Sequence, residues 1–191
     1  MFKNMEKLGE NIYVYKKFLS NKELNEITEE LDALDEEQWI ISPGREQTLA
    51  YASGIETMKY VDDKISNLLI DNLYLGKNKT AVRMMPGNYW EVHTDEYEFK
   101  NVKEKSKEYV DGEPYDEEKL VNFVSIVYFS DFNGGQIYYP SQNIEYAPKP
   151  GDLIIHGSDE LCQHGVKPVI TGKRYSHTNI IYELVKVPKS I

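Results

Sequence analysis

Cysteine and long apolar runs are both scarce in this chain. One cysteine among 191 residues excludes an intramolecular disulfide framework and a cysteine-rich zinc site. Charge, glycine or proline interrupts the aliphatic runs well before the roughly 20 residues that a bilayer-spanning helix needs. The first residues lack the charged, apolar and small-residue pattern of a secretion signal. We therefore expect a soluble cytoplasmic protein without a membrane partner.

Positive charge is also in deficit. Lysine and arginine number 22 against 32 aspartates and glutamates, which gives a formal net charge of -10. Such a surface repels a phosphate backbone unless a local basic patch forms, and the sequence indicates none, so we expect no nucleic-acid partner. The length fits a single domain over residues 1–191, and the fifteen tyrosines favour a sheet-rich one.

The N-terminal third predicts two helices. Residues 11–18 favour a strand, after which Ser20 and Glu23 form the capping box that opens a helix. Apolar residues then recur at helical spacing, namely Leu24, Ile27, Leu31 and Leu34. Residues 42–53 carry the proline, glycine and polar residues of a loop, and residues 58–69 repeat the helical pattern. These helices are expected to pack on a sheet.

Beyond residue 79 the chain breaks into short runs of β-branched and aromatic residues, separated by turn signals such as Asn133-Gly134-Gly135. The predicted strands are residues 80–85, 89–93, 121–130, 136–139, 152–156 and 174–185. Helices followed by many short strands indicate an α+β, mainly β, class in which the helices buttress a sandwich or barrel.

One segment departs from this pattern. Residues 96–119 contain 14 charged residues among 24, with four aromatic residues between them. The two interpretations are a solvated insertion without a role and a lid that covers a substrate. Because the segment directly follows His93 and Asp95, we favour the lid.

His93-Thr94-Asp95 places a histidine and a carboxylate two residues apart, so that on a strand both point to the same side. Such a pair is expected by chance and is weak evidence alone. His164 follows 69 residues after Asp95, and we expect it on the far side of the sheet, where it completes a set of two histidines and one carboxylate. This donor set suits Fe(II) and leaves three coordination positions open, as an oxygenase requires.

Arg174 begins the last predicted strand, ten residues after His164. Alternation places Arg174, Ser176 and Thr178 on one face, where a guanidinium beside a hydroxyl can hold a carboxylate by charge-assisted hydrogen bonds. Lys173 alternates outward. The pattern predicts an anchor for a carboxylate-bearing co-substrate.

The order of these motifs resembles the prolyl 4-hydroxylase branch of the 2-oxoglutarate/Fe(II) oxygenases. The matching pieces are His93-Thr94-Asp95, the strand and Gly-Gly turn over 121–135, Pro-x-x-Gly-Asp at 148–152, and the His-Gly-Val-x-Pro-Val-x-x-Gly-x-Arg-Tyr-Ser motif at 164–176. The last motif is the specific one. The resemblance covers most of residues 11–183.

The resemblance implies a double-stranded β-helix, a jelly-roll or cupin-like core, with the N-terminal helices against it. It implies that His93, Asp95 and His164 bind Fe(II), that 2-oxoglutarate chelates this iron, and that its far carboxylate meets Arg174. Tyr128 and Ser176 match positions beside that carboxylate. The resemblance further implies that O2 is the oxidant, that succinate and CO2 are released, and that ascorbate keeps the iron reduced.

The sequence departs from the family at the other end of the co-substrate pocket. Many relatives have a pocket tyrosine where this chain has Met84 and Met85, and Tyr89 or Trp90 are the candidate replacements.

Three further residues are expected to lie outside the site. His156 stands where the family has an apolar or aromatic residue, and His177 alternates away from Arg174, so both are interpreted as structural or surface histidines. Cys162 is close to His164 in sequence, but a lone cysteine is usually a small buried hydrophobe.

The function predicted from these observations is hydroxylation, with a prolyl residue of a peptide or protein as the favoured substrate and proline-rich segments among the candidates. A free amino acid or another small molecule stays open as the substrate. The rivals are a non-catalytic cupin-like binding module, which has no reason to retain all four site residues, and a nucleic-acid oxygenase, which the net charge disfavours.

Overall fold

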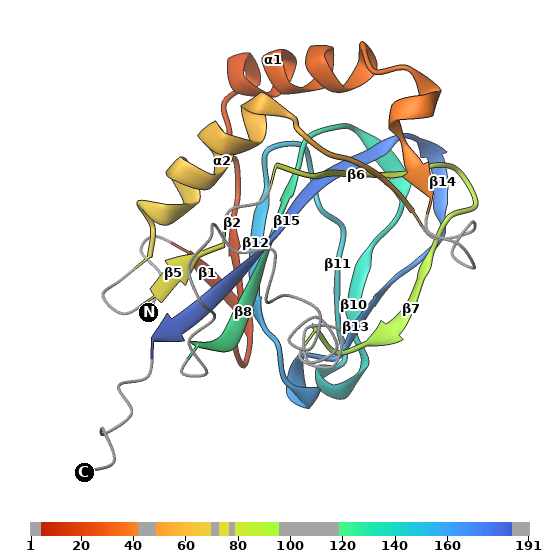
Figure 1. Ribbon diagram of the computed structural model, residues 1–191. Coiled ribbons are helices and arrows are strands. Elements are labelled where there is room, and N and C mark those ends of the chain that lie inside the picture. Colours follow the sequence, from red (N-terminus) through yellow and green to blue (C-terminus); the bar gives the residue numbers. More distant parts are fainter. Residues whose placement is uncertain (1–4, 42–48, 70–72, 77–78, 96–118, 185–191) are drawn as a thin grey trace.

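The strands of the protein form a large and a small antiparallel sheet (Figure 1). The structure is a computed structural model, which describes residues 5–41, 49–69, 73–76, 79–95 and 119–184. In spatial order the large sheet contains β1 (Glu6–Gly9), β2 (Ile12–Tyr15), β12 (Leu153–Gly157), β8 (Lys119–Tyr128), β15 (Arg174–Leu184), β6 (Ala81–Met84), β4 (Ala50–Ala52) and β3 (Ile40–Ile41), with β5 (Leu73–Leu75) paired to β15. The small sheet contains β11 (Ile144–Tyr146), β10 (Ile137–Tyr139), β13 (His164–Val166) and β7 (Trp90–His93). A two-stranded sheet joins β14 (Val169–Gly172) to β9 (Phe132–Gly134). The predicted α+β, mainly β, class is confirmed.

Both predicted helices are present. Ser20 caps α1 (Asn21–Asp32) in the predicted capping box: its Oγ accepts from the Glu23 backbone N–H, and its own N–H donates to the Glu23 carboxylate. The second helix, α2 (Glu56–Ser66), begins two residues before the start of the predicted range 58–69 and ends three residues before its end. In the described part of the chain, no helix has the length and apolar content that a membrane crossing requires.

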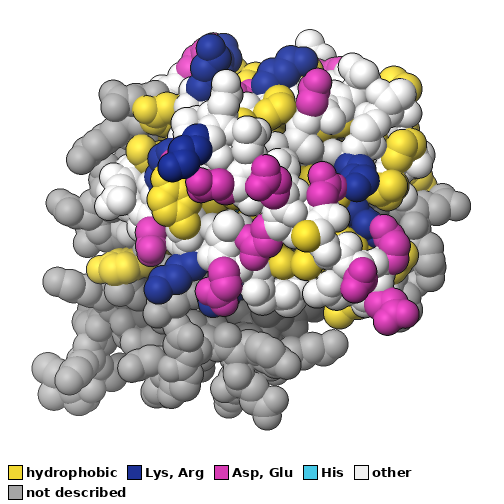
Figure 2. Space-filling model, turned by 90° about the horizontal axis from the view of Figure 1, so that it is seen from above, with side chains coloured by type: hydrophobic (Ala, Val, Ile, Leu, Met, Phe, Trp, Pro, Cys, Tyr) yellow, Lys and Arg dark blue, Asp and Glu magenta, His cyan; other side chains and the backbone are white. Residues whose placement is uncertain are grey.

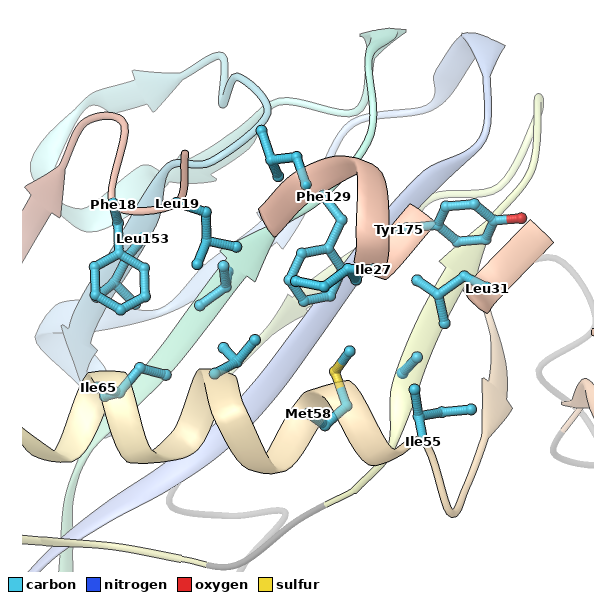
Figure 3. Close-up of a cluster of buried hydrophobic side chains, with 14 of the residues drawn as sticks. Phe18, Leu19, Ile27, Leu31, Ile55, Met58, Ile65, Phe129, Leu153 and Tyr175 are labelled. Carbon is cyan, nitrogen blue, oxygen red and sulfur yellow. The ribbon is translucent and has the colours of Figure 1, made fainter. Parts of the chain in front are cut away.

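The helices pack on the outer face of the large sheet, the face turned away from the small sheet (Figure 1). Figure 3 shows Ile27 and Leu31 from α1 and Met58 and Ile65 from α2 in one cluster with Phe129, the residue that follows β8. Burial of a continuous apolar layer of this kind is the main term that stabilises a domain. The helices are therefore the predicted buttress.

The inner face of the large sheet meets the small sheet in a second core. Val124, Ile126 and Tyr128 of β8 contribute to this inner core together with Ile154 of β12. Residues between them in sequence, such as Val127, belong to the outer core, because successive strand residues point to opposite faces. Each central strand therefore contributes to two different environments.

The structure corrects two sequence expectations about the N-terminal half. Residues 42–53, expected to form a loop, end in β4, while residues 42–48 lie outside the described part. The first strand is shorter than predicted and is preceded by β1, since Asn11 adopts a left-handed φ of 56° and turns the chain. The charged segment 96–119 also lies outside the described residues, apart from Lys119 at the start of β8.

The surface seen from the α1 side carries charges of both signs (Figure 2). Lys64 pairs with Glu23 at 2.8 Å, and Lys22 pairs with Glu26 at 3.7 Å. Basic and acidic side chains are interspersed on this face (Figure 2).

Candidate functional site

The structure brings the predicted metal ligands together in the interior between the sheets. His93 and His164 lie directly opposite each other on the neighbouring strands β7 and β13, with ring centroids 4.4 Å apart. Their Nε2 atoms lie 3.8 and 4.0 Å from the two carboxylate oxygens of Asp95, and one ligand atom of each residue lies within 4.8 Å of the others. His164 therefore lies beside His93 in one sheet, and the expectation of a far-side position was wrong.

The position of Asp95 in this cluster does not follow from the alternation of side chains along a strand. The strand β7 ends at His93, so the rule that places residues i and i+2 on one side does not extend to Asp95. The chain turns after His93 and carries the carboxylate back to it, at 7% exposure. The prediction of proximity was correct, but its geometric reason was not.

Backbone carbonyls fix the ring orientation of both histidines. Nδ1 of His93 lies 2.9 Å from the Glu91 carbonyl oxygen, and Nδ1 of His164 lies 3.2 Å from that of Cys162. Because a carbonyl only accepts, Nδ1 carries the hydrogen in each of these bonds, and Nε2 is the nitrogen left to face a ligand. Burial lowers the pKa of His164 well below its usual value, and neighbouring histidines add to the effect. The Nε2 atoms of two imidazoles thus face one carboxylate, an arrangement that fits a divalent cation.

The predicted carboxylate anchor is a buried arginine. Arg174 is 3% exposed, and its Nη atoms lie 3.4 Å from the Tyr128 hydroxyl and 3.4 Å from Ser176 Oγ. Its Nε has no hydrogen-bond partner, and no carboxylate among the described residues lies within ion-pair distance of it. A buried cation without a counter-charge is unfavourable, so this position suits an anionic ligand.

Gly135 of the predicted turn lets Arg174 take this position. Its φ of +61° is left-handed, and a Cβ there would lie 3.1 Å from Arg174 Cδ. Glycine tolerates this backbone conformation and leaves space for the arginine stem.

The methionines that replace the family's pocket tyrosine differ in position. Met84 is fully buried, with Sδ 3.3 Å from Arg174 Nη1, so it lies beside the predicted anchor, whereas Met85 is exposed. Of the two candidate replacements, Trp90 contacts the His93 ring at 5.4 Å between centroids, while Tyr89 makes no such ring contact. Trp90 is therefore the candidate that the structure brings to the metal cluster.

Two residues of this interior were not predicted from the sequence. His156, expected to lie outside the site, is fully buried with Nε2 3.8 Å from Asp95 Oδ2 and its ring 4.3 Å from that of His164. Tyr139 is also fully buried, and its ring lies 5.6 Å from that of His156; its hydroxyl has no partner among the described residues. The sequence offered no usable signal, because β12 is apolar on both faces. The structure puts His156 on the same inner face as Ile154.

The other residues considered from sequence lie away from the site. His177 points to the helix side, where its ring nitrogens meet the Asp62 carboxylate at 2.7 Å and the Thr80 carbonyl at 2.9 Å. Lys173 pairs with Asp32 on the surface at 2.7 Å. Burial raises the pKa of the Cys162 thiol to about 12, as expected for a structural cysteine.

Comparison with known proteins identifies the fold. No protein-family model matches the sequence, and a search of curated proteins finds no match. Among solved structures, the viral collagen prolyl hydroxylase of Paramecium Bursaria Chlorella virus-1, in complex with 2-oxoglutarate, is 16% identical with a TM-score of 0.65, over 92% of this chain and 98% of that one. A prolyl hydroxylase of Trichoplax adhaerens, bound to a hypoxia-inducible-factor peptide fragment, is 16% identical with a TM-score of 0.65, over 91% and 84%.

A third similar structure is not named as a prolyl hydroxylase. HygX of Streptomyces hygroscopicus, with nickel and 2-oxoglutarate bound, is 14% identical with a TM-score of 0.62, over 91% of this chain and 83% of that one. At these identities the likeness establishes the fold. It is the double-stranded β-helix predicted from the sequence, with two helices on its outer face.

Proposed function

We propose that this chain is an Fe(II)- and 2-oxoglutarate-dependent oxygenase. The observation that carries the proposal is the pairing of two complementary sites in one interior. A cluster of two imidazoles and a carboxylate suits a divalent metal, and a buried guanidinium suits a carboxylate. Arg174 is among the groups that lower the pKa of His164, which indicates that the two sites are electrostatically coupled. A dicarboxylate that chelates a metal at one end suits both.

Each side chain has a distinct role in this proposal. His93, Asp95 and His164 hold the iron, which supplies the redox chemistry for O2 activation when it is bound together with 2-oxoglutarate. Arg174 binds the far carboxylate of 2-oxoglutarate, and the hydroxyls of Tyr128 and Ser176 orient the guanidinium. Burial of these groups excludes water and strengthens each charged contact. Ascorbate is the proposed reductant.

A prolyl residue of a peptide is the proposed substrate. Two of the similar structures are prolyl hydroxylases, and one of them holds a peptide fragment. A small molecule is the second candidate, because HygX has also been solved with hygromycin B bound, at 14% identity and a TM-score of 0.60. The described site residues fit either class, since both use the same metal and co-substrate groups.

The test is succinate formation from 2-oxoglutarate by the purified full chain under air with Fe(II) and ascorbate. Wild type is compared with Asp95→Ala and Arg174→Met, and Lys173→Met is the matched control, because it removes the adjacent cation on the outer surface. We expect both site variants to lose turnover and the control to keep it. Absence of turnover, iron binding and 2-oxoglutarate binding in the wild type would favour a non-catalytic binding module instead.

The substrate class is tested in the same assay. A proline-rich peptide pool is compared with a matched pool in which alanine replaces proline, and with a set of small amines and amino acids. Stimulation by the proline pool alone, with a mass gain of one oxygen in the peptide, supports prolyl hydroxylation. Stimulation by a small molecule alone transfers the proposal to that class.

A further inference from the structure

We propose that Tyr139 is a further co-substrate-binding residue, whose hydroxyl donates a hydrogen bond to 2-oxoglutarate. The proposal deepens the co-substrate site of the proposed function and rests on it. The sequence motifs do not include this residue. The pocket tyrosine of many relatives precedes the metal motif, where this chain has Met84 and Met85, whereas Tyr139 comes from a different strand, β10.

Tyr139 points into the interior from the small sheet. It is the last residue of β10, which lies between β11 and β13, and its side chain is fully buried. Its ring lies 5.8 Å from that of His164 and 5.6 Å from that of His156, measured between centroids. It belongs to the same inner core as Tyr128, whose hydroxyl meets Arg174. Tyr139 therefore lies beside the metal cluster and shares a core with the carboxylate anchor.

The hydroxyl of Tyr139 is a buried donor without an acceptor. It has no hydrogen-bond partner among the described residues and no exposure to solvent. Burial raises the pKa of this hydroxyl well above its usual value, and nearby groups that include Tyr128 and Asp95 raise it further. The hydroxyl therefore keeps its proton and can donate. Because a buried donor without an acceptor is unfavourable, we infer that a ligand in this interior supplies the acceptor.

The other two buried tyrosines in the described part of the chain are arranged differently. The Tyr128 hydroxyl accepts from Arg174 at 3.4 Å, and the Tyr175 hydroxyl donates to Asp32 at 2.9 Å. A phenylalanine at position 139 would fill the same core without burying an unpartnered hydroxyl. A ligand that accepts a hydrogen bond accounts for a tyrosine at this position.

The co-substrate carries the acceptors that Tyr139 lacks. 2-Oxoglutarate has two carboxylates and a keto oxygen, and each of these groups accepts hydrogen bonds. In the proposed site its chelating end lies at the metal that His164 helps to hold, and its far carboxylate meets Arg174. Tyr139 then donates from the small sheet while Arg174 donates from the large sheet. A buried donor of this kind also discriminates against ligands that offer it no acceptor.

The test removes the hydroxyl alone. Tyr139→Phe is compared with wild type and with Tyr138→Phe, the matched control, which removes a hydroxyl from the opposite face of β10, where the Tyr138 ring packs beside Gly165. Calorimetry on the full chain loaded with Zn(II) measures the dissociation constant of 2-oxoglutarate. We expect Tyr139→Phe to raise it about 10- to 100-fold, the usual loss for a hydrogen bond to a charged group, and Tyr138→Phe to leave it unchanged.

Two further measurements distinguish ligand binding from a structural role. Competition with a chromophoric chelator should give Tyr139→Phe the Zn(II) affinity of wild type, because no metal ligand is removed. Urea unfolding of the ligand-free protein should show equal or higher stability for Tyr139→Phe, because an unpartnered buried hydroxyl is removed.

Oxalate, which has only a chelating end, identifies the acceptor. Weaker oxalate binding by Tyr139→Phe places the hydrogen bond at the metal end of the co-substrate. Unchanged oxalate binding, together with weaker 2-oxoglutarate binding, places it at the far carboxylate.

The outcomes separate this proposal from the proposed function. Wild-type affinity of Tyr139→Phe for 2-oxoglutarate, or an equal loss in Tyr138→Phe, overturns the role of Tyr139 and leaves the proposed oxygenase intact. Lower stability or lower Zn(II) affinity of the ligand-free Tyr139→Phe overturns it as well, because the hydroxyl would then support the fold or the metal cluster. No 2-oxoglutarate binding by the Zn(II)-loaded wild type overturns both proposals.

Discussion

The buried polar groups on the two faces of β8, β12 and β15 differ in their hydrogen bonding. On the outer face His177 has a partner at each ring nitrogen, and Asn179 donates to the same Asp62 carboxylate at 2.9 Å. On the inner face Arg174 Nε and His156 Nε2 have no partner among the described residues. Native proteins satisfy nearly all buried polar atoms, so the unpartnered atoms of the inner face support the proposed ligand site.

The difference has an energetic consequence. An unsatisfied buried polar group costs about 1–3 kcal/mol, so the unpartnered atoms of the inner face lower the stability of the ligand-free protein. The outer network stabilises the fold, since removal of one partner leaves the others buried and unpaired. Substitutions on the two faces should therefore differ in the property that they change and in the sign of the stability effect.

The largest effect is expected at Asp95. Asp95→Ala should lower succinate formation by about 10³-fold or more, because the only carboxylate of the proposed metal set is lost. The unfolding free energy of the metal-free protein should stay equal or rise, since a buried carboxylate is removed. Succinate assays and urea unfolding in chelator check the two parts. A large loss of stability in the metal-free variant would place Asp95 among the structural residues.

Arg174→Met is expected to weaken 2-oxoglutarate binding by roughly 30-fold to several thousand-fold, which corresponds to about 2–5 kcal/mol for a buried charged contact. The metal-free variant should unfold with a free energy about 1 kcal/mol higher, because an uncompensated buried cation is replaced by an apolar chain of similar length. Calorimetry with Zn(II) and urea unfolding measure the two values. Lys173→Met, as the control, should change neither by more than about 0.5 kcal/mol. Equal effects in both variants would contradict an anchor at Arg174.

The outer face should respond in the opposite way. Asp62→Ala should lower the unfolding free energy by about 3 kcal/mol, because His177 and Asn179 lose their shared acceptor in a buried network. The folded fraction should bind 2-oxoglutarate with unchanged affinity. Urea unfolding and calorimetry at 10 °C test both statements. A stable variant with weakened co-substrate binding would remove the contrast between the faces.

The residues of the inner site were predictable where chemically distinctive side chains occur at a recognisable spacing in the sequence. The His93 and Asp95 pair, His164 and Arg174 form a sequence pattern with a chemical meaning, and the structure places them in one interior. His156 was missed because Leu153, Ile154 and Ile155 precede it as a continuous apolar run. On a strand that is buried on both faces, apolar and polar residues do not alternate, so the sequence does not show which residues point to the inner side.

The fold shows the same limit. The capping box of α1 is a local signal and was predicted to the residue. Strands of two to four residues, such as β3 and β13, are too short to show a period, and their pairing depends on contacts distant in sequence. The position of His164 beside His93 could therefore be learned only from the sheet.

The smallest predicted effect lies at the outer end of the helix layer. Burial raises the pKa of Glu23, but hydrogen bonds from Lys64, Tyr60 and Ser20 outweigh it and lower the pKa from 4.5 to about 2. A carboxylate whose folded pKa is depressed stabilises the fold above its unfolded pKa, and this contribution is lost as the pH falls from about 4.5 toward 2. Glu23→Gln should therefore unfold about 1 kcal/mol more easily than wild type at pH 7.

This difference between Glu23→Gln and wild type should shrink steadily below pH 4.5, and urea unfolding at several pH values measures it. Glu26→Gln, on the same helix but in a longer 3.7 Å ion pair with Lys22, is the control and should change stability by at most about 0.5 kcal/mol. A pH-independent difference at Glu23 would mean that packing, not charge, stabilises this contact. Because Glu23 lies on the helix layer, its protonation should leave 2-oxoglutarate affinity unchanged, which extends the contrast between the faces to an electrostatic contact.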